Sequence, residues 1–354
     1  MNGAERLLAA CRRQPVDATP VWFMRQAGGS LPGYRRLRER HSVLDIAKRP
    51  ALCAEVTCAA VETLGVDGAV LFADIMLPVE AMGVDVALTA EGPIIADPIR
   101  TARDVTRLRA VDPRADLGFV LEAIALTRQA LGGRAAVIGL AGGPFTLAAY
   151  LIEGGPSRDQ LRARALMHAA PEAWDALLRH IADVTIGYLA AQVEAGAQVV
   201  QVFDTWAGSL SAADYVRFVR PHATRILAAI ADVPVVHFAA GTSGMLEAFA
   251  GAGGTVLGVD ERQSIAHAWA RVGPRWAVQG NLDPARVLAG WGPAADGARA
   301  ILAEVGGRPG HVFNLGHAAP READPAMLRD LVQLVRDESA TACDPRAVEV
   351  PIGA

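Results

Sequence analysis

The sequence is almost without lysine: Lys48 is the only one among its 34 lysines and arginines. Schiff-base aldolases and pyridoxal enzymes need a lysine amine at the reacting centre. Lys48 belongs to the segment VLDIAKRP, which has the pattern of a surface helix. The scarcity of lysine therefore disfavours both of these enzyme classes.

Cysteine is also scarce, and its spacing is uninformative. The four cysteines, Cys11, Cys53, Cys58 and Cys343, form no CxxC pair, and none lies beside a histidine at metal-ligand spacing. We therefore expect free thiols that mostly serve packing in a reducing compartment, and no metal site.

Long apolar runs are missing too. No run reaches the ~18 residues that a membrane span needs, and the longest candidate, 137–152, is interrupted by Gly142, Gly143 and Pro144. The first residues lack the features of a signal peptide and instead have the pattern of an amphipathic helix. The formal net charge of −4 gives no reason to expect nucleic acid or a membrane as a partner. We expect a cytoplasmic protein.

What the sequence does have is a repeated alternation of apolar runs and helical segments. Helical spacing is clear in 159–169, 174–195 and 327–338, and no GxGxxG follows any run, which disfavours a doubly wound sheet. This pattern predicts an α/β fold with a single (β/α)8 TIM barrel domain over residues 1–354. A β-hairpin insertion is expected at 84–98, after the second strand. The eight apolar runs are 21–25, 68–74, 135–143, 198–204, 234–239, 255–260, 277–283 and 311–317.

In such barrels the active site lies at the carboxyl ends of the strands. The runs end in a set of residues able to do chemistry: Arg25, Asp74, Gly142 and Gly143 leading to Tyr150, Asp204 with Thr205, His237, Asp260, Asn281 with Asp283, and His317.

Four of these residues have both a functional and a structural interpretation. An arginine fork at a barrel mouth suits a carboxylate or phosphate, but Arg25 could also pair with a strand-end aspartate. Asp74 could cap the following helix. Tyr150 could belong to the core. His317 could act as an acid, a base or a substrate anchor, or could be buried against the backbone.

Several segments together resemble the uroporphyrinogen decarboxylase family over nearly the whole chain. The resemblance is carried by six motifs in the expected order: PVWFMRQAG with LP and YR (20–35), LFADI (71–75), AGGPFTL with YLIEGG (141–155), QVFDTWAG (201–208), QGNLDP (279–284) and FNLGH (313–317).

This resemblance implies a carboxy-lyase that needs no cofactor. Such an enzyme converts the four acetate side chains of uroporphyrinogen III to methyl groups, giving coproporphyrinogen III in haem biosynthesis, usually as a homodimer. By carry-over, Asp74 holds the pyrrole N–H groups, and Arg25 binds a substrate carboxylate or takes part in proton transfer. Substrate binding is further implied for Gln26, Ala27 and Gly28, and for Tyr150, Thr205 and His317.

The main departures from the family pattern are at four positions. Gly29 stands in place of an arginine, Gly33 in place of an acidic residue, Ala73 in place of serine and Ala318 in place of glycine. The departures leave open a divergent paralogue that acts on, or only binds, another tetrapyrrole or a smaller carboxylate. A corrinoid-linked methyltransferase shares the barrel, but its zinc ligands include a His-x-Cys on the fifth strand, and here the sequence is His237-Phe238-Ala239.

Overall fold

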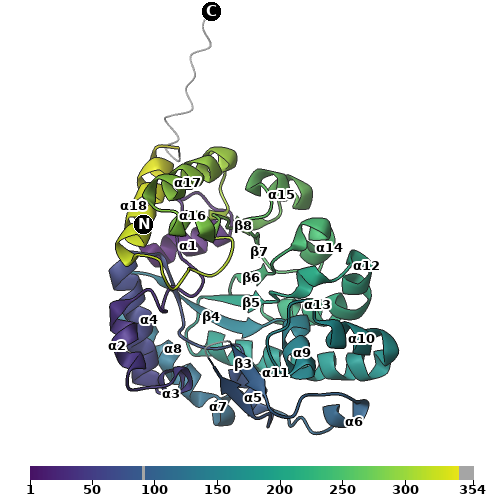
Figure 1. Cartoon of the computed structure of the whole chain (residues 1–354). Helices are drawn as coiled ribbons and strands as arrows, with labels where there is room; N and C mark the ends of the chain where they lie inside the picture. The colour runs from purple at the N-terminus through teal and green to yellow at the C-terminus, as the bar shows by residue number, and fades with distance from the viewer. Residues whose placement is uncertain (90–91, 343–354) are drawn as a thin grey trace, which may run out of the picture.

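The central feature of the computed structural model, which describes residues 1–89 and 92–342, is one sheet of seven parallel strands. The sheet curves through the middle of the molecule, with helices around it (Figure 1). The strands follow in the order β1 (Gly68–Val70), β4 (Ala136–Gly142), β5 (Val199–Phe203), β6 (Val235–Phe238), β7 (Val256–Gly258), β8 (Ala277–Gln279) and β9 (His311–Val312).

An extended segment at residues 20–22 closes the sheet into a barrel. On one side, the Phe313 N–H donates to the Pro20 carbonyl at 2.9 Å, and the Trp22 N–H donates to the Phe313 carbonyl at 3.3 Å. On the other side, the Asp67 N–H donates to the Val21 carbonyl at 2.7 Å. The segment therefore joins β9 to β1, and the predicted barrel architecture is confirmed.

The prediction of a regular first strand over 21–25 is wrong, however, because only Val21 takes part in a strand bridge. Side-chain oxygens accept hydrogen bonds from the backbone N–H groups that would otherwise pair with a neighbouring strand. The Phe23 N–H donates to the Gln26 side chain at 2.9 Å, and the Met24 N–H donates to the Asn314 side chain at 3.2 Å. Arg25 then turns the chain with a φ of 59°.

Helices follow the strands and cover the outside of the barrel. Those of eight residues or more are α1 (Gly3–Cys11), α4 (Pro50–Leu64), α8 (Gly118–Leu131), α9 (Pro144–Glu153), α10 (Leu161–Ala169), α11 (Pro171–Glu194), α13 (Arg220–Ala229), α15 (Ile265–Val272), α17 (Trp291–Val305) and α18 (Pro325–Ala342). The shorter ones are α2 (Pro32–Arg38), α3 (Val43–Ala47), α5 (Leu77–Ala81), α6 (Ala102–Val105), α7 (Pro113–Asp116), α12 (Ala212–Asp214), α14 (Leu246–Ala250) and α16 (Pro284–Leu288).

The amino-terminal end of the barrel is covered by α1, the amphipathic helix expected from the sequence. It contacts β1, β4, β8 and β9. Buried Asp67, just before β1, ties this end together: its carboxylate accepts from the Val21 N–H at 2.9 Å and from Arg6 at 2.7 Å. Arg336 of α18 adds a third contact at 3.3 Å. The amino-terminal end of the barrel is therefore closed, and its role is structural.

Hydrogen-bonded side chains run through the barrel interior. The Trp22 indole donates to Gln279, and the Gln279 amide donates to Gln201, both at 3.0 Å; the Gln201 amide in turn lies 3.5 Å from the Met24 sulfur. Because these buried polar groups satisfy one another, the space beneath the mouth is packed rather than open.

The predicted hairpin is present as β2 (Val86–Leu88) and β3 (Pro93–Ile95), paired antiparallel. Its expected turn includes Glu91, which lies outside the described residues. The β3 strand packs on α9, which places the hairpin beside the helix that carries Tyr150.

The scarce residues take structural or surface positions. Lys48 caps α3 and pairs with Glu80 at 2.6 Å on the surface. Cys11 and Cys53 are buried free thiols and Cys58 is a half-buried one, whereas Cys343 lies outside the described residues.

Candidate active site

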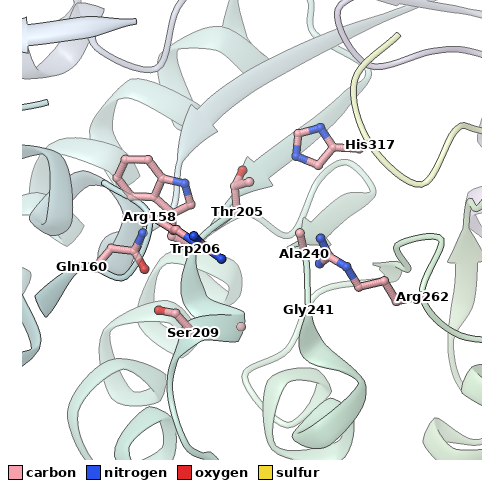
Figure 2. Close-up of a pocket in the computed structure, with 10 residues that line it drawn as sticks. Arg158, Gln160, Thr205, Trp206, Ser209, Ala240, Gly241, Arg262 and His317 are labelled. Carbon is pink, nitrogen blue, oxygen red and sulfur yellow. The ribbon is translucent and has the colours of Figure 1, made fainter. Parts of the chain in front are cut away.

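A cavity of about 310 Å³ lies where loops follow the carboxyl ends of the strands. Thr205 and Trp206 reach it after β5, Ala240 and Gly241 after β6, and Arg262 after β7. Figure 2 shows Thr205 near the middle, with His317 and Arg262 on one side and Trp206 and Gln160 on the other. The complete lining is Arg158, Gln160, Thr205, Trp206, Gly208, Ser209, Ala240, Gly241, Arg262 and His317.

Thr205 and His317, two of the predicted binding residues, therefore line the same cavity. The Thr205 carbonyl accepts from the Ala240 N–H at 3.2 Å, which fixes the loop, and the hydroxyl makes no hydrogen bond to residues 1–89 or 92–342. Desolvation lowers the pKa of His317, the Glu261 carboxylate opposes this change, and Arg25 and Arg262 add to it. The imidazole is therefore biased toward its neutral form, which can still donate one hydrogen bond.

Asp74 lies half-buried on the loop after β1. One of its oxygens accepts from the Met76 N–H at 2.8 Å. Burial raises the pKa of Asp74, and the Met76 hydrogen bond and the positive charge of Arg25 oppose that rise. The hydrogen bond to Met76 resembles a capping contact, but it engages one oxygen and leaves the other for a further donor.

Tyr150 connects Asp74 to the cavity. Its pKa is raised mainly by burial and further by the Asp74 carboxylate, while Arg25 lowers it. The Tyr150 ring lies 4.2 Å from the Trp206 ring, centroid to centroid, and Trp206 lines the cavity. Arg25, Asp74, Tyr150 and His317 thus form one electrostatic neighbourhood at the mouth.

Arg25 is exposed, and it makes no hydrogen bond or ion pair to any residue in 1–89 or 92–342. The structural alternative, a salt bridge to a strand-end aspartate, is therefore not what the structure shows. Its left-handed backbone conformation is unusual for a non-glycine residue and is held by the Gln26 side chain.

Gln26, Ala27 and Gly28 contribute differently from Arg25. The Gln26 side chain is fully buried, accepting from Phe23 and donating to the Gly68 carbonyl at 2.8 Å. Ala27 is also buried, and Gly28 is half-buried. Within the described part of the chain, the backbone N–H groups of Ala27 and Gly28 have no hydrogen-bond acceptor. Any contribution of this segment to binding therefore comes from its backbone.

The remaining strand-end candidates lie outside the cavity lining. Asp204 is fully buried and accepts from the Thr146 N–H at 2.7 Å. His237 is fully buried against Phe249, with ring centroids 3.9 Å apart. Two of the other three tie neighbouring loops together: Asp260 accepts from the Gly241 N–H of the loop after β6, and Asn281 donates to backbone carbonyls of the loop after β7. Asp283 caps α16.

Several cavity-lining side chains were missed by the sequence reasoning, among them Trp206, Ser209 and Arg262. Trp206 directly follows Thr205, and Arg262 lies two residues after the sixth strand run, so a wider window at each strand end would have included both. Arg158 and Gln160 come from the loop between α9 and α10, and no strand-end rule points to that loop.

Comparison with known proteins decides the family. Residues 2–338 match the family model described as Uroporphyrinogen decarboxylase (URO-D). A protein named uroporphyrinogen decarboxylase from Sorangium cellulosum (strain So ce56) is 49% identical over 334 residues, covering 94% of this chain and 95% of the relative. One of the same name from Roseiflexus sp. (strain RS-1) is 46% identical over 343 residues, covering 95% and 99%.

The chain belongs to the uroporphyrinogen decarboxylase family. It is therefore an enzyme of the carboxy-lyase class, as the motifs implied. Solved structures share the fold. A methyltransferase from Methanosarcina mazei aligns with a TM-score of 0.80 at 21% identity, covering 96% of this chain and 99% of that one. A putative vitamin-B12 independent methionine synthase from Listeria monocytogenes aligns with a TM-score of 0.57 at 13% identity, covering 92% and 98%.

These structural likenesses extend to the barrel alone. The methyltransferase hypothesis needed a cysteine at position 239, where the chain has buried Ala239. Across residues 1–89 and 92–342, no cluster of three or more His, Cys, Asp or Glu side chains is placed to hold a metal ion. The same part of the chain holds no helix long and apolar enough to cross a membrane.

The departures from the uroporphyrinogen decarboxylase motifs have different structural consequences. Gly33 faces open space, so nothing in its surroundings requires glycine. Ala318 does not have a positive φ, so replacing the family's glycine leaves the backbone unstrained there. Gly29 is different, because a Cβ built on it would lie 2.8 Å from the Cβ of Arg321.

Proposed function

We propose that the chain decarboxylates the four acetate side chains of uroporphyrinogen III to give coproporphyrinogen III, without a cofactor, in haem biosynthesis. The observation that carries this is the grouping of Asp74, Arg25, Tyr150 and His317 at one end of a barrel whose family acts on this substrate. A carboxylate suits a pyrrole because it can accept N–H donors and stabilise positive charge.

In the proposed reaction, a proton adds to a ring carbon of a pyrrole, and the ring becomes an iminium-like electron sink. The bond between the acetate methylene and its carboxylate breaks, its electron pair enters the ring system, and carbon dioxide leaves. The methylene then takes up a proton and the ring carbon loses the one it gained, which leaves a methyl group. Asp74 accepts the pyrrole N–H groups and stabilises the positive ring.

Carboxylate binding is assigned to the surrounding groups. The guanidinium of Arg25 makes no hydrogen bond or ion pair among the described residues, and its fork matches a carboxylate. The backbone N–H groups of Ala27 and Gly28 are further donors next to it, on the loop that Gln26 holds in place. Thr205 and His317 in the cavity lining, and Tyr150 packed on Trp206 beside it, complete the set.

We also propose a single barrel domain that works in the cytoplasm as a homodimer. The family model covers residues 2–338 without a break, which supports one domain. The dimer and the compartment follow from the family resemblance, and sedimentation of the purified protein tests the dimer.

The function is tested by anaerobic incubation of the purified protein with uroporphyrinogen III, followed by oxidation, chromatography and mass measurement of the products. Stepwise loss of carbon dioxide down to coproporphyrinogen is expected. Asp74→Asn should lower kcat by roughly 10²–10³-fold, as loss of a positioned electrostatic group does. Asp283→Asn is the matched control, because Asp283 caps α16 outside the cavity and asparagine caps equally well.

Unchanged uroporphyrinogen after incubation with folded wild-type protein would overturn the proposal. A divergent paralogue that acts on a different carboxylate, or only binds its ligand, would then be the better explanation.

A further inference from the structure

Arg321 lies on the loop between β9 and α18, four residues after the cavity residue His317. The Ala319 N–H donates to the Met24 carbonyl at 2.8 Å, which holds this loop against the residue before Arg25. Arg321 is not part of the cavity lining itself. It therefore lies beside the mouth, where the edge of a wide tetrapyrrole would pass.

Gly29 and Arg321 occupy the same space. A Cβ on Gly29 would lie 2.8 Å from the Arg321 Cβ and 3.8 Å from its Nε. Gly29 has no positive φ, so its backbone conformation does not require glycine. The close approach of Arg321 is what excludes a side chain at position 29.

The guanidinium of Arg321 has no partner in 1–89 or 92–342: it makes no ion pair and no hydrogen bond there, and its side chain is exposed. Its positive charge nevertheless acts on Tyr34, because it opposes the rise that burial causes in the pKa of that residue. Tyr34 packs on Phe72, with ring centroids 5.2 Å apart, and Phe72 lies two residues before Asp74. Arg321 is therefore an unpaired cation close to the loops that carry Arg25 and Asp74.

We propose that Arg321 binds a peripheral carboxylate of the substrate and supplies, from the last barrel loop, the positive charge that residue 29 does not provide. This assignment rests on the proposed function for the identity of the ligand, and it makes Arg321 a substrate-binding rather than a catalytic residue. An exposed arginine at a rim acts mainly through charge and a bidentate hydrogen bond to an oxyanion.

The test compares wild type with Arg321→Ala, Arg321→Lys and the exchange variant Gly29→Arg/Arg321→Gly. In decarboxylation assays, Arg321→Ala should raise KM for uroporphyrinogen roughly 5- to 30-fold with kcat within about twofold, the size of one charge-assisted contact. The lysine variant should recover part of the loss. The exchange variant should recover most of it, because glycine at position 321 removes the Cβ that would lie 2.8 Å from a Cβ at position 29 and so makes room for the arginine there. Arg329→Ala, which removes the same charge from the exposed face of α18, should leave KM unchanged.

Binding of oxidised uroporphyrin, followed by its fluorescence, separates this proposal from the proposed function because it needs no turnover. A Kd that rises in Arg321→Ala but not in Arg329→Ala supports the carboxylate contact, even if the wild type releases no carbon dioxide. Equal KM and Kd values for wild type and Arg321→Ala would overturn it, and so would a loss that Arg329→Ala reproduces.

Discussion

The two ends of the barrel use charge in opposite ways. At the amino-terminal end, the buried Asp67 carboxylate is shared between Arg6, Arg336 and the Val21 N–H. At the mouth, Arg25 and Arg321 have no hydrogen-bonding or ionic partner in the described part of the chain.

This difference separates stability from function. A buried charge with its partners in place is costly to break, because the remaining charge is stranded. An arginine held at a mouth without a protein partner contributes little to folding, but it is ready to bind a carboxylate ligand. Mutations at the amino-terminal end should therefore change the free energy of unfolding, and mutations at the mouth should change kinetic constants.

The largest effect on stability is expected at the amino-terminal end of the barrel. Asp67→Ala leaves Arg6 and Arg336 without their shared carboxylate and the Val21 N–H without its acceptor, which should lower the free energy of unfolding by about 3–5 kcal/mol. Urea denaturation measures this. The surface pair Arg114–Glu194 provides the control, since Arg114→Ala should change stability by less than ~1 kcal/mol. Equal losses in the two variants would remove the contrast between the two ends.

Arg25→Gln should show the opposite pattern. Loss of a charged contact to a substrate carboxylate should cost about 2–5 kcal/mol, and so lower kcat/KM roughly 30-fold or more. The urea midpoint should stay within experimental error, because no hydrogen bond or ion pair within the described chain is lost. A large fall in stability without a fall in kcat/KM would show that Arg25 is structural.

Asp204→Asn tests a buried carboxylate at the carboxyl end of β5, outside the cavity lining. Burial raises the pKa of Asp204 from its ordinary 3.8 to about 6, with the hydrogen bonds from Thr146 opposing the rise. The folded protein therefore holds this proton more tightly than the unfolded chain, so stability due to Asp204 is present below pH 4 and lost as pH rises through 6.

The asparagine variant should consequently be more stable than wild type above pH 6, by at most about 3 kcal/mol, and the difference should vanish toward pH 4. Taking the difference between the variants at each pH cancels the opposite contributions of His237 and His311, whose pKa values burial lowers. A difference in stability that does not change with pH would contradict the assignment.

The smallest effect is expected for Thr205→Val, which keeps the shape of the side chain and removes one hydroxyl from the cavity. Loss of one neutral hydrogen bond of about 1 kcal/mol should raise KM roughly fivefold and leave kcat nearly unchanged. Thr106→Val, an exposed threonine on the outer surface, is the control for the substitution itself. A fall in kcat with constant KM would instead place Thr205 in the chemical step.

Much of the fold could be predicted because it depends on local patterns. Seven of the eight apolar runs contain a strand, and the helix and hairpin expected before and between them are present. The first run failed because the side chains of Gln26 and Asn314 accept hydrogen bonds from backbone N–H groups that a strand would use. Gln26 is only three residues from Phe23, but Asn314 is 290 positions from Met24, and a local pattern cannot reveal that contact. The expectation that site residues follow the carboxyl ends of strands correctly predicted that Thr205 and His317 line the cavity. It could not predict Arg158, which lies on a loop between two helices.

The sequence by itself determined the alternation of strands and helices, the residues at the strand ends and the family, because periodicity and motifs are properties of neighbouring residues. Only the tertiary structure decided which charges are paired and which are left for a ligand. Asp67 and Asp74 are both aspartates beside the same short strand, yet one is closed in by two arginines and the other opens toward the mouth. Nothing in the sequence indicated that Gly29 and Arg321 lie close together, because contacts between distant segments form only when the barrel closes.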